Sequence, residues 1–225
     1  MTARIWISLF LSLFLLVLLP LLFGQLLAAS LTKLNLDTSS AILLVFAIIV
    51  GSFINIPVRR VRHSDDVIAH PLTAFGLSGF WPKLQRVRRE TVIAVNLGGC
   101  IIPVGLAIYE FAALIASDVH FLWAVAAAAL INTAICYFLA RPVLGIGIAL
   151  PGLVPGIVAA LCALLFAPDH AAPVAFIAGV SGPLIGADLL HLKDVNAMRA
   201  AVVSIGGAGT FDGIFLSGIL AAYLA

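Results

Sequence analysis

The chain has 225 residues and a formal net charge of +2; 63% of the residues are hydrophobic and only 10% are charged, whereas a soluble domain carries about 25% charged residues. A water-soluble fold of this length could not cover so much apolar surface, so the composition excludes an ordinary soluble enzyme, a disordered chain and a secreted disulfide scaffold. The apolar stretches are continuous rather than alternating, which favours spanning helices over outer-membrane strands. We therefore expect one integral membrane domain, residues 1–225, built as an all-α, polytopic bundle of transmembrane helices.

Seven stretches are long enough to cross a bilayer, which takes about 20 apolar residues. The first stretch ends in small residues that resemble a signal-peptide cleavage site, but its apolar run is longer than such peptides have, so we expect it to be retained as a helix. The seven predicted spans are residues 5–29, 40–58, 91–116, 121–140, 143–166, 172–192 and 200–225.

Basic residues fall almost entirely on one side of these spans. Of the twelve Lys and Arg residues, only Lys33 lies on the opposite side, where Asp37, Glu110, Asp118 and Asp169 also fall. Because loops rich in Lys and Arg stay in the cytoplasm, the sequence predicts a cytoplasmic N-terminus and an external C-terminus.

Residues 59–90 form the one long polar segment, which we expect to be a basic cytoplasmic loop. Its cations are predicted to meet anionic lipid headgroups, each contributing about 1 kcal/mol, and no nucleic acid is expected as a partner. The histidines and aspartates of the loop do not have the spacing of a metal motif. No phosphate loop or dinucleotide fingerprint is present, so no metal and no cofactor are predicted. The sequence does not indicate an oligomeric state.

Helix breakers recur within the predicted spans. Pro57 is expected to end the second span, and Pro103 interrupts the third, which also contains Asn96. The fifth span contains Pro151 and Pro155 among several glycines. Since proline in a helix interior removes a hydrogen bond and clashes with the preceding turn, we expect kinked or broken helices here.

Two aspartates, Asp188 and Asp212, fall inside the last two predicted spans. A carboxylate at bilayer depth costs about 2.5–3.5 kcal/mol on insertion scales, so it is usually compensated and often functional. A short turn makes these two helices antiparallel neighbours. The two carboxylates would lie at different depths along unbroken helices, and they would match better if residues 206–209 interrupt the last helix.

The glycines beside Asp212 have two interpretations. Gly207 and Gly209 lie in the candidate break, where glycine permits non-helical backbone. Alternatively, Gly209, Gly213 and Ser217 are spaced by four residues and form a stripe of small side chains that lets another helix approach closely. The packing interpretation is preferred for Gly213 and Ser217.

We expect the polar residues near the cytoplasmic face to line a vestibule that ends at Asp212. Asp188 and Asp212 could share a proton and activate water, as in aspartic proteolysis. They could equally bind protons or cations in a transporter or channel component. A third interpretation gives each aspartate a structural hydrogen bond to a neighbouring backbone, in a non-catalytic scaffold. The other predicted lining residues are Asn55, Asn96 and Thr210.

Four stretches of the chain resemble an uncharacterised prokaryotic family of multipass membrane proteins, a domain of unknown function. They are residues 51–57, residues 96–99 with Pro103 and Tyr109, residues 184–188 and residues 207–213. This resemblance implies a multipass protein of the prokaryotic plasma membrane and no established activity.

The last two predicted helices also resemble the GxGD intramembrane aspartyl proteases, the presenilin and signal-peptide-peptidase group. Asp188 matches the first aspartate of that group and Asp212 the second. The resemblance implies a protease-like hydrolase acting on a membrane protein or peptide. The chain departs from the pattern, because Thr210 and Phe211 separate the glycines from Asp212, no tyrosine precedes Asp188, and no later helix carries a Pro-Ala-Leu element.

Overall fold

The computed structural model describes residues 14, 18, 24–63, 89–117, 119–143, 147–195, 200–207 and 213–225. The prediction of an all-α helix bundle is confirmed: the described part of the chain is mostly helical and contains seven helices. A helix over residues 24–33 precedes six others. These are α2 (Thr38–Gly51), α3 (Ile102–Ser117), α4 (Leu122–Leu139), α5 (Val154–Phe166), α6 (Ala171–Ser181) and α8 (Gly213–Leu224).

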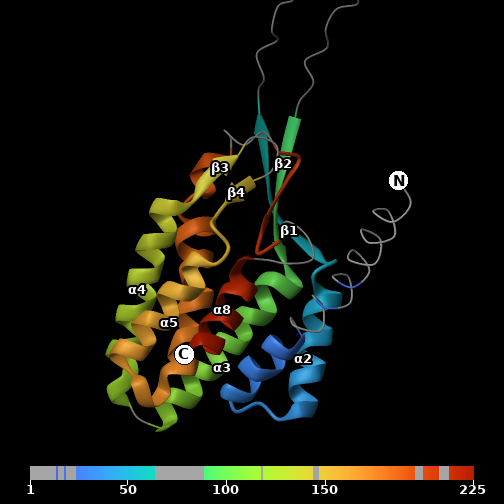
Figure 1. The fold of residues 1–225 in the computed structure, drawn as a ribbon. Coiled ribbons are helices and arrows are strands. Elements are labelled where there is room, and N and C mark those ends of the chain that lie inside the picture. The colour runs from blue at the N-terminus through green and yellow to red at the C-terminus, as the bar shows by residue number, and fades with distance from the viewer. Residues whose placement is uncertain are drawn as a thin grey trace, which may run out of the picture.

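Two helices are extended at the same end of the bundle by wider turns. The π-helix η2 (Leu97–Ile101) leads into α3, and the π-helix η5 (Gly182–Leu189) continues α6. Single turns of 3-10 helix over Val119–Phe121, Pro168–His170 and Leu192–Asp194 connect the helices. Successive helices alternate in direction, so that α2, α4 and α6 run toward the top of Figure 1 and α3, α5 and α8 run away from it.

Helix α6 is the centre of the bundle. It packs against α3, α4, α5 and α8, and all of its residues except Pro173 and Ser181 are buried. Small side chains permit this close packing: a Cβ atom at Gly179 would lie 2.9 Å from the carbonyl oxygen of Ser217 on α8. Ser217 is fully buried, so its predicted packing role is confirmed.

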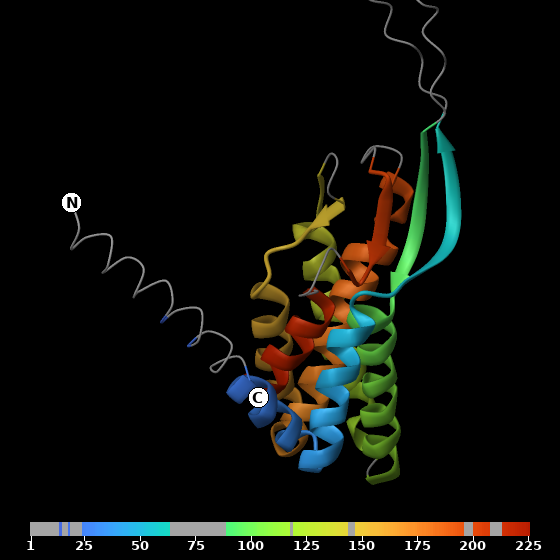
Figure 2. The same ribbon diagram turned by 90° about the vertical axis from the view of Figure 1, so that its right-hand side faces the viewer.

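Five short strands gather at one end of the bundle, which we call the strand end (Figures 1 and 2). In the three-stranded sheet, β1 pairs antiparallel with β2, and β2 pairs parallel with β5. A separate hairpin pairs β3 with β4. The strands are β1 (Asn55–His63), β2 (Arg89–Asn96), β3 (Arg141–Val143), β4 (Gly147–Ala149) and β5 (Val202–Ile205).

The strands replace parts of four predicted spans. The second helix ends at Gly51 rather than at residue 58, and the third begins at residue 97 rather than 91. The fifth and last helices begin at Val154 and Gly213, several residues later than predicted. The replaced segments are short and rich in Val and Ile, and a short continuous apolar run fits a buried strand as well as a helix. The predicted loop 59–90 likewise begins and ends in paired strand, with residues 64–88 outside the described part of the chain.

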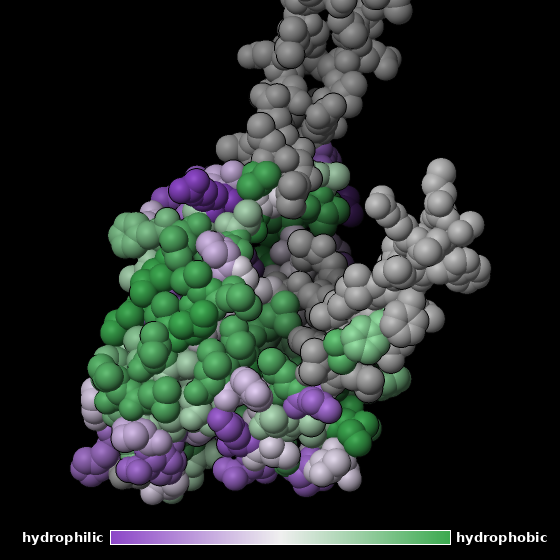
Figure 3. All heavy atoms as spheres, viewed as in Figure 1, coloured by the Kyte–Doolittle hydropathy of each residue, from purple (hydrophilic) through white to green (hydrophobic). Residues whose placement is uncertain are grey.

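The outer surface of the bundle is strongly apolar. Phe138 is 80% exposed, Leu165 78% and Leu130 70%, and Figure 3 shows hydrophobic side chains covering the middle of the bundle, with hydrophilic ones at its two ends. Among the described residues, three helical segments are long and apolar enough to cross a membrane, Leu97–Ser117, Val119–Leu139 and Pro168–Asp194. Helices α2, α5 and α8 are apolar but shorter.

Candidate functional site

A cluster of polar side chains lies where the helices meet the sheet. We define the polar cluster as Ser52, Asn55, Asn96, Asp188 and Ser204, together with the backbone of Gly206 and Gly207. Its members come from segments far apart in the sequence: the end of α2, the paired ends of β1 and β2, η5, and β5 with the turn that follows it.

Asn96 is the buried centre of the polar cluster, with an exposed fraction of 2%. Its Nδ2 donates hydrogen bonds to the carbonyl oxygen of Ser52 at 2.8 Å and to Oδ1 of Asn55 at 3.1 Å. Its Oδ1 accepts a hydrogen bond from the backbone N–H of Gly99 at 2.7 Å. Asn96 has extended backbone and therefore caps η2, the role for which asparagine is favoured at helix starts.

Asn55 joins all three strands at their ends. It pairs with Asn96 in the register of β1 and β2, and its Oδ1 also accepts a hydrogen bond from Oγ of Ser204 on β5 at 2.6 Å. Asn55 is exposed whereas Asn96 is buried, so the amide pair extends from the interior to the surface. Strand pairing, rather than depth along two helices, brings Asn55 and Asn96 together, and their role in lining a vestibule stays a prediction.

Asp188 reaches the same place from η5. Its Oδ2 accepts a hydrogen bond from the backbone N–H of Gly206 at 3.0 Å. No described residue donates a hydrogen bond to its other oxygen, Oδ1. One carboxylate oxygen of Asp188 is therefore held by the backbone.

Gly206 and Gly207 bring Asp188 and Asn96 to the same turn. Gly206 has φ +72°, a conformation that favours glycine, and a Cβ atom there would overlap Cys100. A Cβ atom at Gly207 would lie 2.8 Å from Cβ of Asn96. Neither glycine is helical; whether residues 206–209 as a whole interrupt a spanning helix stays a prediction, because residues 208–212 lie outside the described part of the chain.

Asp212, Thr210 and Gly209 lie outside the described residues, so the pairing of Asp188 with Asp212 stays a prediction. Gly213 begins α8, and a Cβ atom there would meet nothing within 4 Å. Because residues 208–212 lie outside the described part of the chain, the packing role of Gly213 stays a prediction.

The four prolines lie where regular α-helix begins, ends or changes. Pro57 lies in strand β1, six residues beyond the end of α2. Pro103 follows the π-helical turns of η2 within the continuous helical segment Leu97–Ser117. Pro151 precedes α5 and Pro155 is its second residue, where proline is tolerated because the N–H group it lacks has no partner. The fifth predicted span is therefore divided near Pro151 into strand and helix.

Glu110 is not among the site residues predicted from the sequence, where it falls on the side opposite the cations. Glu110 lies within α3 and is only 4% exposed, and its Oε1 has no hydrogen-bond partner among the described residues. The signal that could have found it is the spacing of Leu106, Glu110 and Leu114, which places all three on one helix face.

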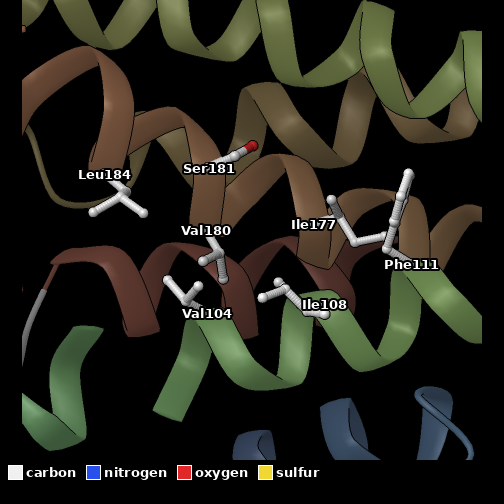
Figure 4. Close-up of a pocket in the computed structure, with 8 residues that line it drawn as sticks. Val104, Ile108, Phe111, Ile177, Val180, Ser181 and Leu184 are labelled. Carbon is white, nitrogen blue, oxygen red and sulfur yellow. The ribbon is translucent and has the colours of Figure 1, made fainter. Parts of the chain in front are cut away.

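An apolar groove lies between α3 and α6 (Figure 4). It has a volume of about 200 Å³ and contains one polar lining residue, Ser181. The other lining residues are Val104, Ala107, Ile108, Phe111, Ile177, Val180 and Leu184. Within the described part of the chain, no group of three His, Cys, Asp or Glu residues could hold a metal ion.

Replacing Asn96 by alanine is expected to lower the free energy of unfolding by about 3 kcal/mol, because it leaves the Gly99 N–H group and the Ser52 carbonyl without partners in a buried place. The matched control is Asn55→Ala, expected to cost about 1 kcal/mol because water can replace the amide at an exposed site. Denaturant unfolding in detergent micelles measures both. Equal losses for the two variants would contradict the central role of Asn96.

One family matches most of the chain: the family described as "Protein of unknown function (DUF1614)" matches residues 49–224. No curated protein and no solved structure matches the chain.

Proposed function

The chain belongs to this family of proteins of unknown function (DUF1614), and we propose that it is a multipass protein of the prokaryotic plasma membrane with its functional site in the polar cluster. The apolar outer surface and the three helical segments long enough to span a bilayer support the membrane assignment. The polar cluster is then a set of hydrogen-bonding groups at one end of a bundle whose outer surface is apolar.

The placement of charge supports a cytoplasmic strand end. Arg59, Arg60, Arg141 and Lys193 are all exposed at the strand end. Lys33 lies at the opposite end, at the C-terminus of the helix over residues 24–33, where it donates a hydrogen bond to the carbonyl oxygen of Tyr223 at 2.8 Å. By the positive-inside rule, the strand end faces the cytoplasm.

A reporter fused after Ala225 tests this orientation. Helix α8 runs away from the strand end, so the fusion is expected to be external: alkaline phosphatase active and green fluorescent protein dark. A second fusion, inserted after Arg141 at the strand end, is the internal control and should give the opposite pair of readings. A cytoplasmic reading after Ala225 would contradict the orientation.

The partners proposed for the strand end are anionic lipid headgroups. Strand β1 exposes Ile56 and Val58 directly before the exposed Arg59 and Arg60. An apolar segment followed by cations fits the boundary between acyl chains and phosphate groups, where each cation contributes about 1 kcal/mol.

For the activity itself, we propose an aspartyl-type intramembrane hydrolase that uses Asp188 and Asp212. The observation that carries the proposal is the hydrogen bond from Gly206 to Oδ2 of Asp188, which fixes that carboxyl group, while Oδ1 has no hydrogen-bond donor among the described residues. Asp212 follows Gly206 by six residues. A second carboxyl group at Oδ1 would give a pair that shares one proton, in which one oxygen accepts a proton from water while the other acid donates one. The substrate class is a membrane protein or peptide.

The proposal is tested with the full chain in proteoliposomes. A mixture of single-span peptides is added in the bilayer, and cleavage is followed by mass spectrometry for the wild type and for the Asp188→Asn, Asp212→Asn double variant. Cleavage by the wild type alone supports the hydrolase. Absence of cleavage by the wild type, at every pH from 4 to 8, contradicts it.

A small proton-linked or cation-linked transporter is the second candidate, favoured by the three short helices. Helix α2 has 14 residues, which span about 21 Å at 1.5 Å per residue, short of the roughly 30 Å hydrocarbon core. Helix α2 leads into strand β1 at the strand end, and α5 follows strand β4 there. Discontinuous helices of this kind line the ion and substrate sites of many transporters. In the same proteoliposomes, pH-driven ion flux without peptide cleavage would favour transport.

A further inference from the structure

Helix α3 carries a carboxyl group on its buried face. Leu106, Glu110 and Leu114 are all buried, and residues four apart lie on the same side of a helix. Leu106 belongs to the hydrophobic cluster that contains Leu31 and Phe176, and Leu114 to the adjoining one. Glu110 therefore lies between two hydrophobic clusters in the middle of the bundle.

This position is far from the polar cluster at the strand end. Glu110 is seven residues before the end of α3 at Ser117, or about 10 Å from the end opposite the strands at 1.5 Å per residue. In the proposed orientation it lies in the outer half of the membrane. The site is therefore separate from Asp188, and it does not depend on the hydrolase proposed above.

The described surroundings of Glu110 contain no positive side chain that could neutralise a carboxylate. Helix α3 packs against η2, the 3-10 turn Val119–Phe121, α6 and α8, and it shares the two hydrophobic clusters with α2, α4, α5 and the helix over residues 24–33. Among the described residues of these elements, Lys33 is the one Lys or Arg, and its Nζ donates a hydrogen bond to the carbonyl oxygen of Tyr223. The other titratable side chains on these elements are Cys100, His120, Cys136, Tyr137, Cys162 and Tyr223.

An ionised carboxylate in such a place would be a buried charge without an ion pair, which is strongly unfavourable, whereas the protonated acid buries only a polar group. The neutral acid is therefore the resting state that this environment favours. We propose that Glu110 is a proton-binding site inside the bundle, which takes up and releases a proton independently of the polar cluster.

The groove between α3 and α6 lies beside this part of α3, although Glu110 is not one of its lining residues. Ala107 and Phe111, one turn before Glu110 and next to it, both line the groove, and Figure 4 shows Phe111 extending beside Ile177 along the interface. A small apolar reagent dissolved in lipid can therefore approach the α3–α6 interface.

Infrared spectroscopy of the full chain in lipid at pH 7 tests the protonation state. The wild type is expected to show a carboxylic-acid C=O band that Glu110→Gln removes and Asp188→Asn retains. Glutamine has the shape of the neutral acid, so the thermal midpoint of Glu110→Gln should stay close to that of the wild type. The band should shift in D₂O, because a binding site exchanges its proton. A wild-type band that Glu110→Gln leaves unchanged, or a band that never shifts in D₂O, would overturn the proposal.

Dicyclohexylcarbodiimide provides a chemical readout. The O–H group of a protonated acid adds across a C=N bond of the reagent to form an O-acylisourea, which rearranges to a stable N-acylurea. An exposed glutamate is less than about 1% protonated at pH 7, so peptide mapping should find modification at Glu110 at least roughly tenfold faster than at the exposed Glu90. Asp188→Asn should leave the rate at Glu110 unchanged, even if no hydrolase activity is found. Modification no faster at Glu110 than at Glu90 would overturn the proposal.

Discussion

Gly98→Ala is expected to prevent the chain from folding. A Cβ atom at Gly98 would overlap the carbonyl oxygen of Ile48 and the backbone nitrogen of Ser52 at the end of α2. The backbone N–H of Ser52 donates a hydrogen bond to the carbonyl oxygen of Ile48 at 2.8 Å. Neither atom can therefore move without breaking the hydrogen bond that ends helix α2. Overpacking against side chains costs about 1–3 kcal/mol, and backbone atoms yield less readily, so we expect a loss of at least 3 kcal/mol.

Gly105→Ala is the matched control, on α3, in the same helical segment Leu97–Ser117 as Gly98. A Cβ atom at Gly105 would meet nothing within 4 Å, and alanine is favoured over glycine in a helix by up to about 1 kcal/mol. The yield of monodisperse protein in detergent and its thermal midpoint should be unchanged or higher for Gly105→Ala, and both should collapse for Gly98→Ala. Similar stability of the two variants would show that α2 and η2 do not cross at this glycine.

Asp188→Asn is expected to abolish the activity of the protein while leaving it folded. Asparagine keeps the shape of the side chain, and its carbonyl oxygen can still accept the hydrogen bond from Gly206. It cannot exchange a proton, so a shared-proton pair would lose general acid–base catalysis, typically about 10²–10⁴-fold. Residues that act as one unit are not additive, so the Asp212→Asn variant and the double variant should fall to the same residual rate.

Asp194→Asn is the control for this prediction. Asp194 lies near Asp188, on the 3-10 turn at the strand end, and carries no role in the proposed pair. The Asp194→Asn variant should match the wild type in its rate of peptide cleavage or ion flux and in its thermal midpoint. An Asp188→Asn variant that keeps full activity would contradict the proposed site, and one that unfolds while Asp194→Asn does not would favour the structural interpretation of Asp188.

The bundle could be predicted from the sequence where the apolar runs are long. The fourth and sixth predicted spans agree with α4 and with α6 plus η5 to within a few residues, because a run of about 20 apolar residues has few other stable structures in a membrane. The sheet could not be predicted. Residues 91–96 and 202–205 are rich in Val and Ile, and they form strands because they pair with each other across more than a hundred residues of sequence.

The sequence predicted which residues belong to the candidate site better than it predicted how they are arranged. Asn55, Asn96 and Asp188 are polar residues in apolar surroundings, which singled them out, and they do lie at one end of the bundle. The link between them passes through Ser204 and the Gly206–Gly207 turn, which depend on the unpredicted strand β5. Glu110 was missed because an acid near the end of a predicted span is read as part of a loop, whereas its burial depends on how α3 packs.

The most direct test of the proposed site is a disulfide between positions 188 and 212. Cys100, Cys136 and Cys162 are first replaced by alanine, and Asp188→Cys is combined with Asp212→Cys in native membranes. Asn55→Cys with Ser204→Cys is the positive control, because these side chains are hydrogen-bonded at 2.6 Å. The proposed pair predicts that the 188–212 disulfide forms under mild oxidation about as readily as the control, because both pairs would be hydrogen-bonding neighbours that small movements can bring to the Cβ separation of about 4.5 Å that a disulfide needs. A control pair that closes while the 188–212 pair stays reduced would contradict a site built on Asp188 and Asp212.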